Sequence, residues 1–317
     1  MTALPDSPKV LIHASLRPAQ GHRFQPTGFP DIGAGRYTLP NGTEMVLVES
    51  EQSVANRLEA TCWDESAAGL PDALTGMPYV QVDIDGDPAV TTSLHEAHRL
   101  NSVYIEKSDF RPKLVEAIGY DKKSKRPPNL KALYKALLKY DPNSLVHGCF
   151  LESIAGQLRF ARSLSGFIEA TNIGSVHFGG VKNDHVSPST SESADDKKAK
   201  DGYGNVPFHR EAFTAESLDA YFNIDLQQIR SFALPEPANE FLYALCWYKI
   251  LGFLEGGLRL RTACDLDLVE LRVTRPDNGI EIPSRTHLEE TLKTSLASLE
   301  KDGHLASPST TIAKYTA

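Results

Sequence analysis

Short apolar runs separated by turn residues dominate the chain, and this pattern predicts a protein rich in β-strands. A first run covers Val10–Ile12. Two more runs, 36–39 and 43–48, flank Pro40-Asn41-Gly42, and Asn-Gly between strand-like runs is a strong hairpin signal. Further strand-like runs lie at 145–151, 166–170, 176–178, 218–226 and 258–260. These runs predict a sheet.

One helix is predicted directly after the hairpin, over Ser50–Thr61. Val54 and Leu58 stand four residues apart and therefore share one side of this helix. Another side groups side chains that form hydrogen bonds: Gln52, Ser53, Asn56 and Arg57. A polar face that follows a glycine-rich turn has no obvious role in a core, so it is a candidate binding surface.

Two further helices are predicted towards the end of the sequence. Pro237 opens an apolar helix over 241–254, which ends at Gly256-Gly257 and falls short of the roughly 20 residues of a membrane span. The last helix carries a capping box at Thr286 and Glu289. Leucines at 288, 292, 296 and 299 then recur at helical spacing.

Composition limits the functional classes. The 317 residues carry a net charge of −8, so bulk electrostatics does not attract nucleic acid and any such site must be local. No signal sequence or membrane span is visible, which predicts a cytoplasmic protein. The four cysteines form no C-x-x-C pair, which argues against a zinc ribbon and a disulfide framework.

Two basic features interrupt the acidic background. A run of Lys and Arg at 122–126 leads into a helix with Lys131, Lys135 and Lys139 at four-residue steps, and its simplest interpretation is a solvated helix face. Arg259 and Arg261 alternate with leucines, which places both on one face of a strand, where two arginines can grip phosphates.

Catalytic motifs fail when their spacing is tested. Gly28 and Gly33 have the gap of a phosphate-binding P-loop, but the Lys-Ser/Thr that should follow is absent. The acidic run 83–87 departs from the calcium-loop spacing, and His95 and His98 are one residue closer together than in H-E-x-x-H. No G-x-S-x-G elbow is present. We therefore expect no catalytic residue, metal or cofactor.

Several motifs carry a resemblance to a known family. The most specific are the glycine-rich segment 24–34 and the segment 47–59; others lie at 92–101, 147–150, 164–170, 177–183 and 257–262. Together they resemble the Cas seven-type subunit of type I-G (formerly I-U) CRISPR systems, in the RAMP superfamily. The resemblance covers most of residues 10–275 and leaves out the final forty.

The resemblance implies an α+β fold: one RAMP-type domain over residues 1–317, with a ferredoxin-like, RNA-recognition-type palm. Large insertions would interrupt it, at 76–143 and at a thumb hairpin over 179–213, where the sequence becomes low in complexity. Residues 284–317 would add a C-terminal helix and tail. Several copies would polymerise along a guide RNA and present it to a target DNA strand. Further partners would be a Cas five/six-type fusion, a large subunit and a recruited helicase-nuclease.

A holder of RNA that ignores its sequence needs phosphate donors and little contact with base edges. Exposed amides of the glycine-rich loop would approach the backbone closely, and arginines would add charge. The predicted RNA-binding residues are Gln25, Thr27, Gly28, Gln52, Ser53, Asn56, Arg57, Arg162, Lys182, Asn183, Arg210, Arg259 and Arg261. For each arginine alone, a surface salt bridge is the competing interpretation.

Two rival functions stay open at this stage. Some distant relatives cut bound RNA with a loop aspartate and a divalent ion, and Asp184 would be the equivalent here. Alternatively, the polar helix contacts another protein and the chain has no role with RNA.

Overall fold

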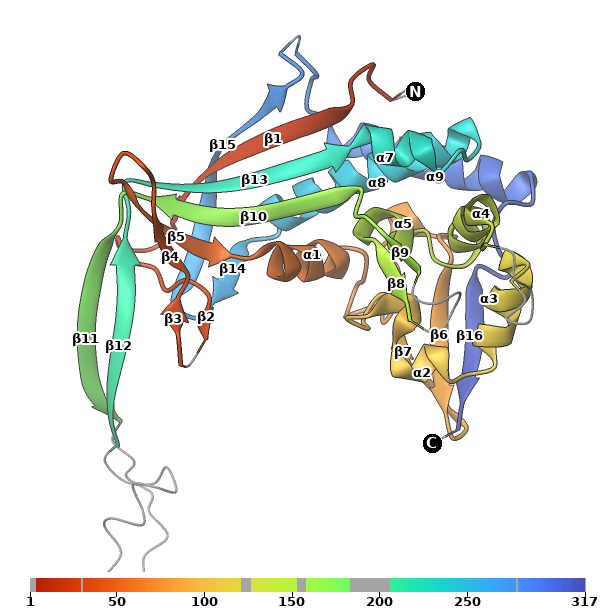
Figure 1. Cartoon of the computed structure of the whole chain (residues 1–317), viewed down its shortest axis with the longest axis horizontal. Helices are drawn as coiled ribbons and strands as arrows, with labels where there is room; N and C mark the ends of the chain where they lie inside the picture. The colour runs from red at the N-terminus through yellow and green to blue at the C-terminus, as the bar shows by residue number, and fades with distance from the viewer. Residues whose placement is uncertain are drawn as a thin grey trace, which may run out of the picture.

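A curled, seven-stranded antiparallel sheet forms the centre of the computed structural model, with strand order β14-β15-β1-β13-β10-β5-β4 (Figure 1). The structure describes residues 4–29, 31–120, 127–152, 158–182, 206–277 and 279–316. The sheet strands are β1 (Lys9–Pro18), β4 (Arg36–Thr38), β5 (Glu44–Glu49), β10 (Leu164–Thr171), β13 (Ser217–Asp225), β14 (Leu258–Arg261) and β15 (Cys264–Arg275).

Strand alternation determines which face of the sheet becomes the core. Along β1, Val10, Ile12 and Ala14 are buried and the residues between them are half-buried. Two helices, α1 (Glu51–Ala60) and α8 (Glu236–Glu255), contact each other and the sheet on this buried side. In chain order α1 lies between β1 and β10, and α8 lies between β13 and β15. The fold is therefore a mixed α+β arrangement with helices on one face of its main sheet.

A long hairpin leaves one end of this sheet and projects away from it (Figure 1). It consists of β11 (Gly174–Lys182) and β12 (Val206–Thr214), paired in register from Gly174 opposite Thr214. The strand begins before Gly179, where sequence analysis placed the start of the thumb hairpin, and continues past it. A Cβ at Gly179 would lie 2.7 Å from the carbonyl oxygen of Phe208, so this glycine permits close strand pairing.

The chain between α1 and β10 forms a second lobe at the opposite end of the molecule from the hairpin (Figure 1). Its three-stranded sheet has the order β16-β6-β7, and the C-terminal strand β16 pairs in parallel with β6. The final residues of the described chain thus complete a lobe built from its middle. The elements are η1 (Asp72–Leu74), β6 (Tyr79–Ile84), β7 (Asp87–Thr92), η2 (Arg99–Asn101), α2 (Val103–Glu106), α3 (Phe110–Ile118), α4 (Leu130–Tyr140), α5 (Asn143–His147), β8 (Cys149–Leu151), β9 (Leu158–Phe160) and β16 (Thr310–Tyr315).

Two more helices belong to the main body. The short α7 (Leu226–Ser231) follows β13, and α9 (Arg285–Lys301) packs along α8. The N-cap of α9 is Ser284, whose hydroxyl accepts a hydrogen bond from the backbone N–H of His287. The predicted capping box at Thr286 is therefore wrong, because the helix begins before that residue. No helix in the described ranges has the length and apolar character to cross a membrane.

The strand predicted over 145–151 is also partly wrong. Residues Asn143–His147 form the short helix α5, and only Cys149–Leu151 is extended. Every residue of α5 is buried, so neither a helical nor a strand period is visible in its apolar pattern. The hydroxyl of Ser144 donates to Asp141 Oδ2 at 2.7 Å, a local contact that favours the turn.

Candidate nucleic-acid interface

A groove of about 550 Å³ lies between the glycine-rich loop and the start of the hairpin. We call it the base groove. Its lining includes five of the residues predicted to bind RNA, namely Gln25, Thr27, Gly28, Arg210 and Arg261. They come from three segments far apart in the sequence, the loop before β4, the strand β12 and the strand β14. The fold therefore brings together residues that only the family resemblance had grouped.

Main-chain hydrogen bonds hold the glycine-rich loop in place. Phe24 is buried and exchanges two backbone hydrogen bonds of 2.8 Å with Phe213. The N–H of Gln25 donates to Ala263 O at 2.7 Å, and that of Thr27 donates to Val48 O at 3.0 Å. These two amides are thus committed within the protein. The expectation that they face a bound strand is wrong for Gln25 and Thr27, which offer only their side chains.

Gly28 has a steric role at the edge of the base groove. It lies in β2 (Gly28–Phe29), which pairs with β3 (Gly33–Ala34) to form a small ribbon. A Cβ at Gly28 would lie 2.7 Å from the carbonyl oxygen of Gly33, closer than side chains tolerate. Glycine at this position therefore lets the two strands approach, and it leaves an exposed stretch of backbone beside the groove.

Two of the predicted arginines share one buried carboxylate. Glu49 is fully buried, and its Oε1 forms ion pairs with Arg57, at 3.3 Å, and with Arg261. Arg261 also donates to the carbonyl oxygen of Gln25 at 2.7 Å. The arginine side chains stay 31% and 26% exposed, so neither is enclosed in the core as Glu49 is. Both arginines therefore form salt bridges, but with a buried carboxylate and not on the surface as the competing interpretation had it. The pairing fixes two cations beside the loop.

The predicted helix and its polar face are confirmed in α1. Ser50 is the N-cap, and its side chain accepts a hydrogen bond from the N–H of Ser53. Ser53 itself is half-buried. Gln52 and Asn56 are exposed and joined by a 3.0 Å hydrogen bond, while Val54 and Leu58 pack into the core. The residues that point into the core are thus those that the helical spacing predicted.

Arg162 lies beside the start of α1. One guanidinium nitrogen donates to Glu51 O at 3.0 Å and the other to Gln52 Oε1. Burial and, next, the charge of Arg99 lower the pKa of Arg162 from its ordinary value. The side chain is half-buried, so part of its charge still faces solvent.

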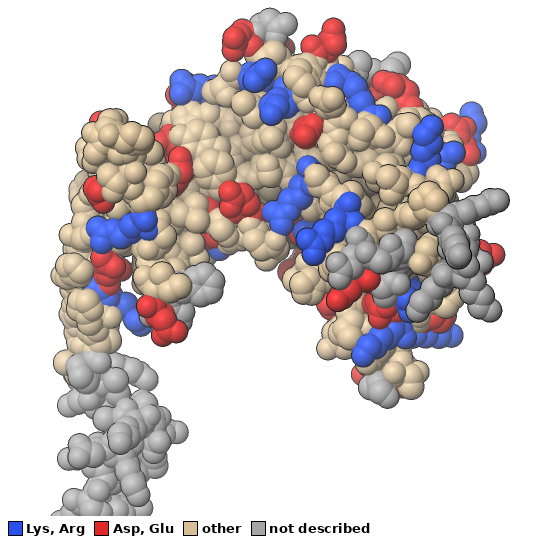
Figure 2. Space-filling view, in the orientation of Figure 1, with Lys and Arg blue, Asp and Glu red and all other residues tan. Residues whose placement is uncertain are grey.

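The molecule is hollowed between the hairpin and the second lobe, and basic side chains lie along the middle of this concave side (Figure 2). The base groove lies where the hairpin begins, and α1 continues from that end towards the second lobe (Figure 1). The described structure therefore offers a concave path with polar and basic groups along it.

Arg259 does not lie in the base groove. It lines a separate groove of about 260 Å³ together with Arg57, between the ends of α1 and α8. The predicted alternation holds in β14, because Leu258 and Leu260 are buried and the two arginines are more exposed. Arg259 and Arg261 nevertheless line different grooves.

The remaining predictions fall at the end of β11. Lys182 is its last residue and lies opposite Val206 in the register of the hairpin. Asn183 and Asp184 lie outside the described residues.

Sequence analysis missed two basic groups at the base of the hairpin. The Arg23 guanidinium lies 4.2 Å from the ring centroid of Phe178, and that of Arg36 lies 5.1 Å from the ring of Phe213. Arg36 also donates to the hydroxyl of Ser175 at 2.7 Å. Both arginines flank the glycine-rich loop in sequence, which is the signal that would have included them.

Two strongly perturbed titratable groups lie in the core, outside the base groove. Burial raises the pKa of Asp141, just before α5, to about 7, and burial lowers the pKa of His147, the last residue of α5. Among the described residues, no cluster of three or more His, Cys, Asp or Glu side chains is placed to hold a metal ion.

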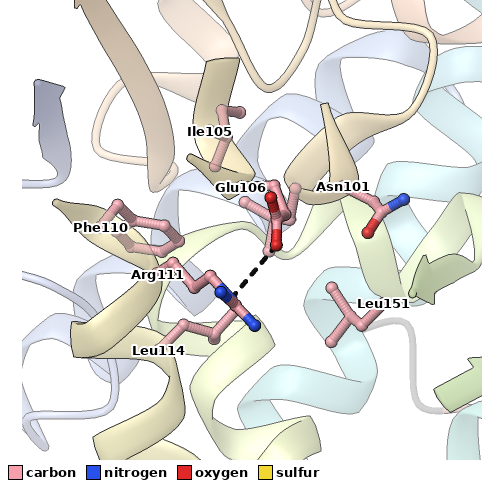
Figure 3. Close-up of a pocket in the computed structure, with 8 residues that line it drawn as sticks. Asn101, Ile105, Glu106, Phe110, Arg111, Leu114 and Leu151 are labelled. Atoms are coloured by element: carbon pink, nitrogen blue, oxygen red, sulfur yellow. Dashed lines mark ion pairs between the residues drawn. The ribbon is translucent and has the colours of Figure 1, made fainter. Parts of the chain in front are cut away.

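A further cavity lies in the second lobe and is mainly apolar (Figure 3). Ile105, Phe110 and Leu114 line it, and an ion pair of 3.3 Å joins Glu106 to Arg111 beside them. Its volume of about 10 Å³ corresponds to about one water molecule, which is too small for a substrate.

Comparison with known families identifies the chain as a CRISPR-associated protein. Residues 10–175, more than half of the chain, match the family model "CRISPR-associated protein GSU0053 (Cas_GSU0053)". The chain belongs to this family. A search of curated proteins finds no match.

Distant likenesses to solved structures also exist. A chain of a "CRISPR RNA-guided surveillance complex, pre-nicking" is 12% identical, with 93% of this chain and 89% of that chain covered and a TM-score of 0.45. Csc2 of Thermofilum pendens is 11% identical over 93% and 76% of the two chains, with a TM-score of 0.30. At these TM-scores we draw nothing further from them.

Proposed function

We propose that this chain is a guide-RNA-binding backbone subunit of a CRISPR surveillance complex, of the Cas seven-type and type I-G, and that it is not itself a nuclease. Membership of a CRISPR-associated family supports the setting. The observation that carries the RNA-binding role is the base groove, where Gln25, Thr27 and Gly28 lie with Arg210 and Arg261.

The chemistry of this groove suits a ribose-phosphate backbone. Arginine presents several N–H donors in a planar fork that matches phosphate geometry. Contacts of this kind fix the position of a strand and carry no sequence information, which a holder of variable guides requires. The exposed Gly28 adds a surface without a side chain, along which a backbone can approach. Base edges then stay free to pair with a target strand.

The fold offers a place for each part of such a subunit. The strand order β15-β1-β13-β10, with α1 and α8 between its members, supports a ferredoxin-like palm. The hairpin of β11 and β12 would be the thumb, and the second lobe would contain the insertion predicted over 76–143. Residues 284–317 would join both parts, through α9 on the palm and β16 in the lobe. Copies would pack head to tail along the guide, a heterologous contact that builds a filament.

Purification tests the proposal directly. We expect the chain, expressed together with a CRISPR array, to copurify with RNA whose sequence maps to that array. Replacement of Arg210, which is exposed, by Glu should release much of this RNA because it places a negative charge in the base groove. The matched control is Arg17→Glu, since the side chain of Arg17 is 70% exposed and lies on the main sheet outside the groove.

Two results would reject the proposal in favour of a rival. A protein free of nucleic acid, with the ultraviolet spectrum of pure protein, would indicate a protein-interaction module. Cleavage of complementary RNA in the presence of magnesium, lost in Asp184→Ala, would indicate a nuclease. RNA retained equally by Arg210→Glu and Arg17→Glu would remove the base groove as the binding site.

A further inference from the structure

The helix α4 of the second lobe presents a stripe of like charge to solvent. Lys131, Lys135 and Lys139 are exposed at four-residue intervals and therefore share one side of the helix. Leu133 and Leu137 lie on the opposite side and are buried. Asn129 caps the helix by accepting a hydrogen bond from the N–H of Ala132 at 3.2 Å. The stripe is thus held on a helix that is capped and packed against the lobe.

No acidic residue balances these lysines on their own helix. Elsewhere an exposed cation pairs with an acid one turn away, as Lys113 does with Asp109 at 3.5 Å and Arg285 does with Glu289 at 3.4 Å. In the described ranges of the chain, no ion pair within 4.0 Å involves a lysine of α4. An ordinary solvated helix alternates the sign of its charges, and α4 does not.

The charge of this part of the sequence opposes that of the whole. Residues 121–140 contain seven Lys or Arg and one Asp, a local charge of +6 in a chain of net charge −8. The rest of the chain is therefore at −14. Like charges in one stretch of sequence repel one another, so a polyanion that neutralises them binds favourably. Such segregation indicates a partner of high negative charge.

The place of α4 in the fold separates it from the base groove. It lies in the second lobe, at the end of the molecule opposite the hairpin (Figure 1). Beside it lies a groove of about 340 Å³ whose lining includes Lys135, Lys139 and His304. The stripe therefore has its own recess, away from the residues to which we assign the guide RNA.

We propose that the lysines of α4 bind the phosphate backbone of double-stranded DNA without regard to sequence. From Lys131 to Lys139 the helix rises about 12 Å, and a DNA duplex carries about seven phosphate charges over that length, twice as many as one strand. Lysine supplies a point charge on a flexible stem, which suits contact with phosphates in varied positions. This function goes beyond guide binding, since it acts on duplex before any pairing with RNA.

The test compares two triple variants of equal net charge. In the first, Lys131, Lys135 and Lys139 are replaced by Gln. In the control, the exposed residues Lys107, Lys293 and Lys314 are replaced by Gln. Binding of a duplex of arbitrary sequence is measured by fluorescence anisotropy across a range of salt concentrations. We assay two preparations of each variant. One is RNA-free protein from a host without an array, and the other is RNA-loaded protein from a host with an array.

For the α4 variant we expect duplex affinity at low salt to fall tenfold or more. The plot of log affinity against log salt should also become less steep, by about 0.9 for each phosphate that the variant no longer neutralises. The control should keep the parent slope, and both variants should retain RNA equally. An unchanged slope in the α4 variant, or an equal loss in the control, would overturn the proposal. If the α4 variant loses RNA, the stripe binds the guide and not duplex DNA. If it binds duplex normally but no longer copurifies with another subunit, the stripe contacts a protein. Because RNA-free protein is assayed too, failure of the guide-binding proposal does not affect this result.

Discussion

The shared carboxylate of Glu49 offers the sharpest test of how the candidate interface is built. We consider Glu49→Gln, which keeps the size of the side chain and removes its charge. The parent residue is fully buried between Arg57 and Arg261, whose side chains are 31% and 26% exposed. In the variant both guanidiniums lose their counterion, and one must face an amide NH₂ group that cannot accept a hydrogen bond.

The magnitude follows from the burial. Removal of one partner from a buried ion pair costs about 3–5 kcal/mol, and the partial exposure of both arginines places this case at the lower end, about 3 kcal/mol. In a chain of this size each kcal/mol lowers the melting temperature by about 2 °C, so we expect a decrease of about 6 °C. RNA retention should also decrease, because Arg261 would no longer be fixed beside Gln25.

Calorimetry and RNA retention measure the two effects, and Glu51→Gln is the matched control. Glu51 lies two residues away, and its side chain is exposed at the start of α1. We expect little change in the control. A melting temperature for Glu49→Gln equal to that of Glu51→Gln would refute the claim that the buried carboxylate anchors the arginines. A lower melting temperature with full RNA retention would leave Glu49 a stabilising role and remove Arg57 and Arg261 from the interface.

Two further predictions concern the core. Burial raises the pKa of Asp141 from 3.8 to about 7, so the folded protein binds a proton that the unfolded chain has lost, and stability should fall as pH rises from about 4 to 7. Asp141→Asn should therefore have a higher free energy of unfolding than the parent at pH 8, and this difference should disappear near pH 4. Urea unfolding at both pH values measures it, and an equal difference at both would contradict the raised pKa. Gly166→Ala should lower the free energy of unfolding by about 1–3 kcal/mol, because its Cβ would lie 2.6 Å from the Phe222 ring. The control Gly69→Ala should unfold like the parent in the same assay, because its Cβ would meet no atom closer than 3.7 Å.

Local signals in the sequence were sufficient for much of the main body. The hairpin of β4 and β5 follows from Pro40-Asn41-Gly42, because a turn closed by the hydrogen bond from Gly42 N–H to Leu39 O is followed by a residue of positive φ, here Gly42 at 89°. Helix α1 follows from the spacing of Val54 and Leu58, which are buried, while Gln52 and Asn56 of its polar face are exposed. In both cases the residues that determine the structure are close together in the chain.

The parts that sequence analysis missed depend on contacts between distant segments. Nothing near Glu49 in sequence indicates that Arg261, more than 200 residues later, will share its carboxylate. Likewise, the pairing of β16 with β6 joins the end of the described chain to the middle, and only the fold reveals it. A buried charge is recognisable once its partner is placed, and placement requires the tertiary structure.

The same buried charge suits the function that we propose, in which an acidic protein would present cations to RNA. A free arginine on the surface must give up side-chain freedom when it grips a phosphate. Arg261 has already lost that freedom, because it donates to Glu49, Val48 O and Gln25 O within the protein. Contact with RNA then costs less entropy, which is the advantage of preorganisation. Glu49 balances one of its two arginines, so the trio keeps a net positive charge beside the glycine-rich loop, and the site is basic although the chain as a whole is acidic.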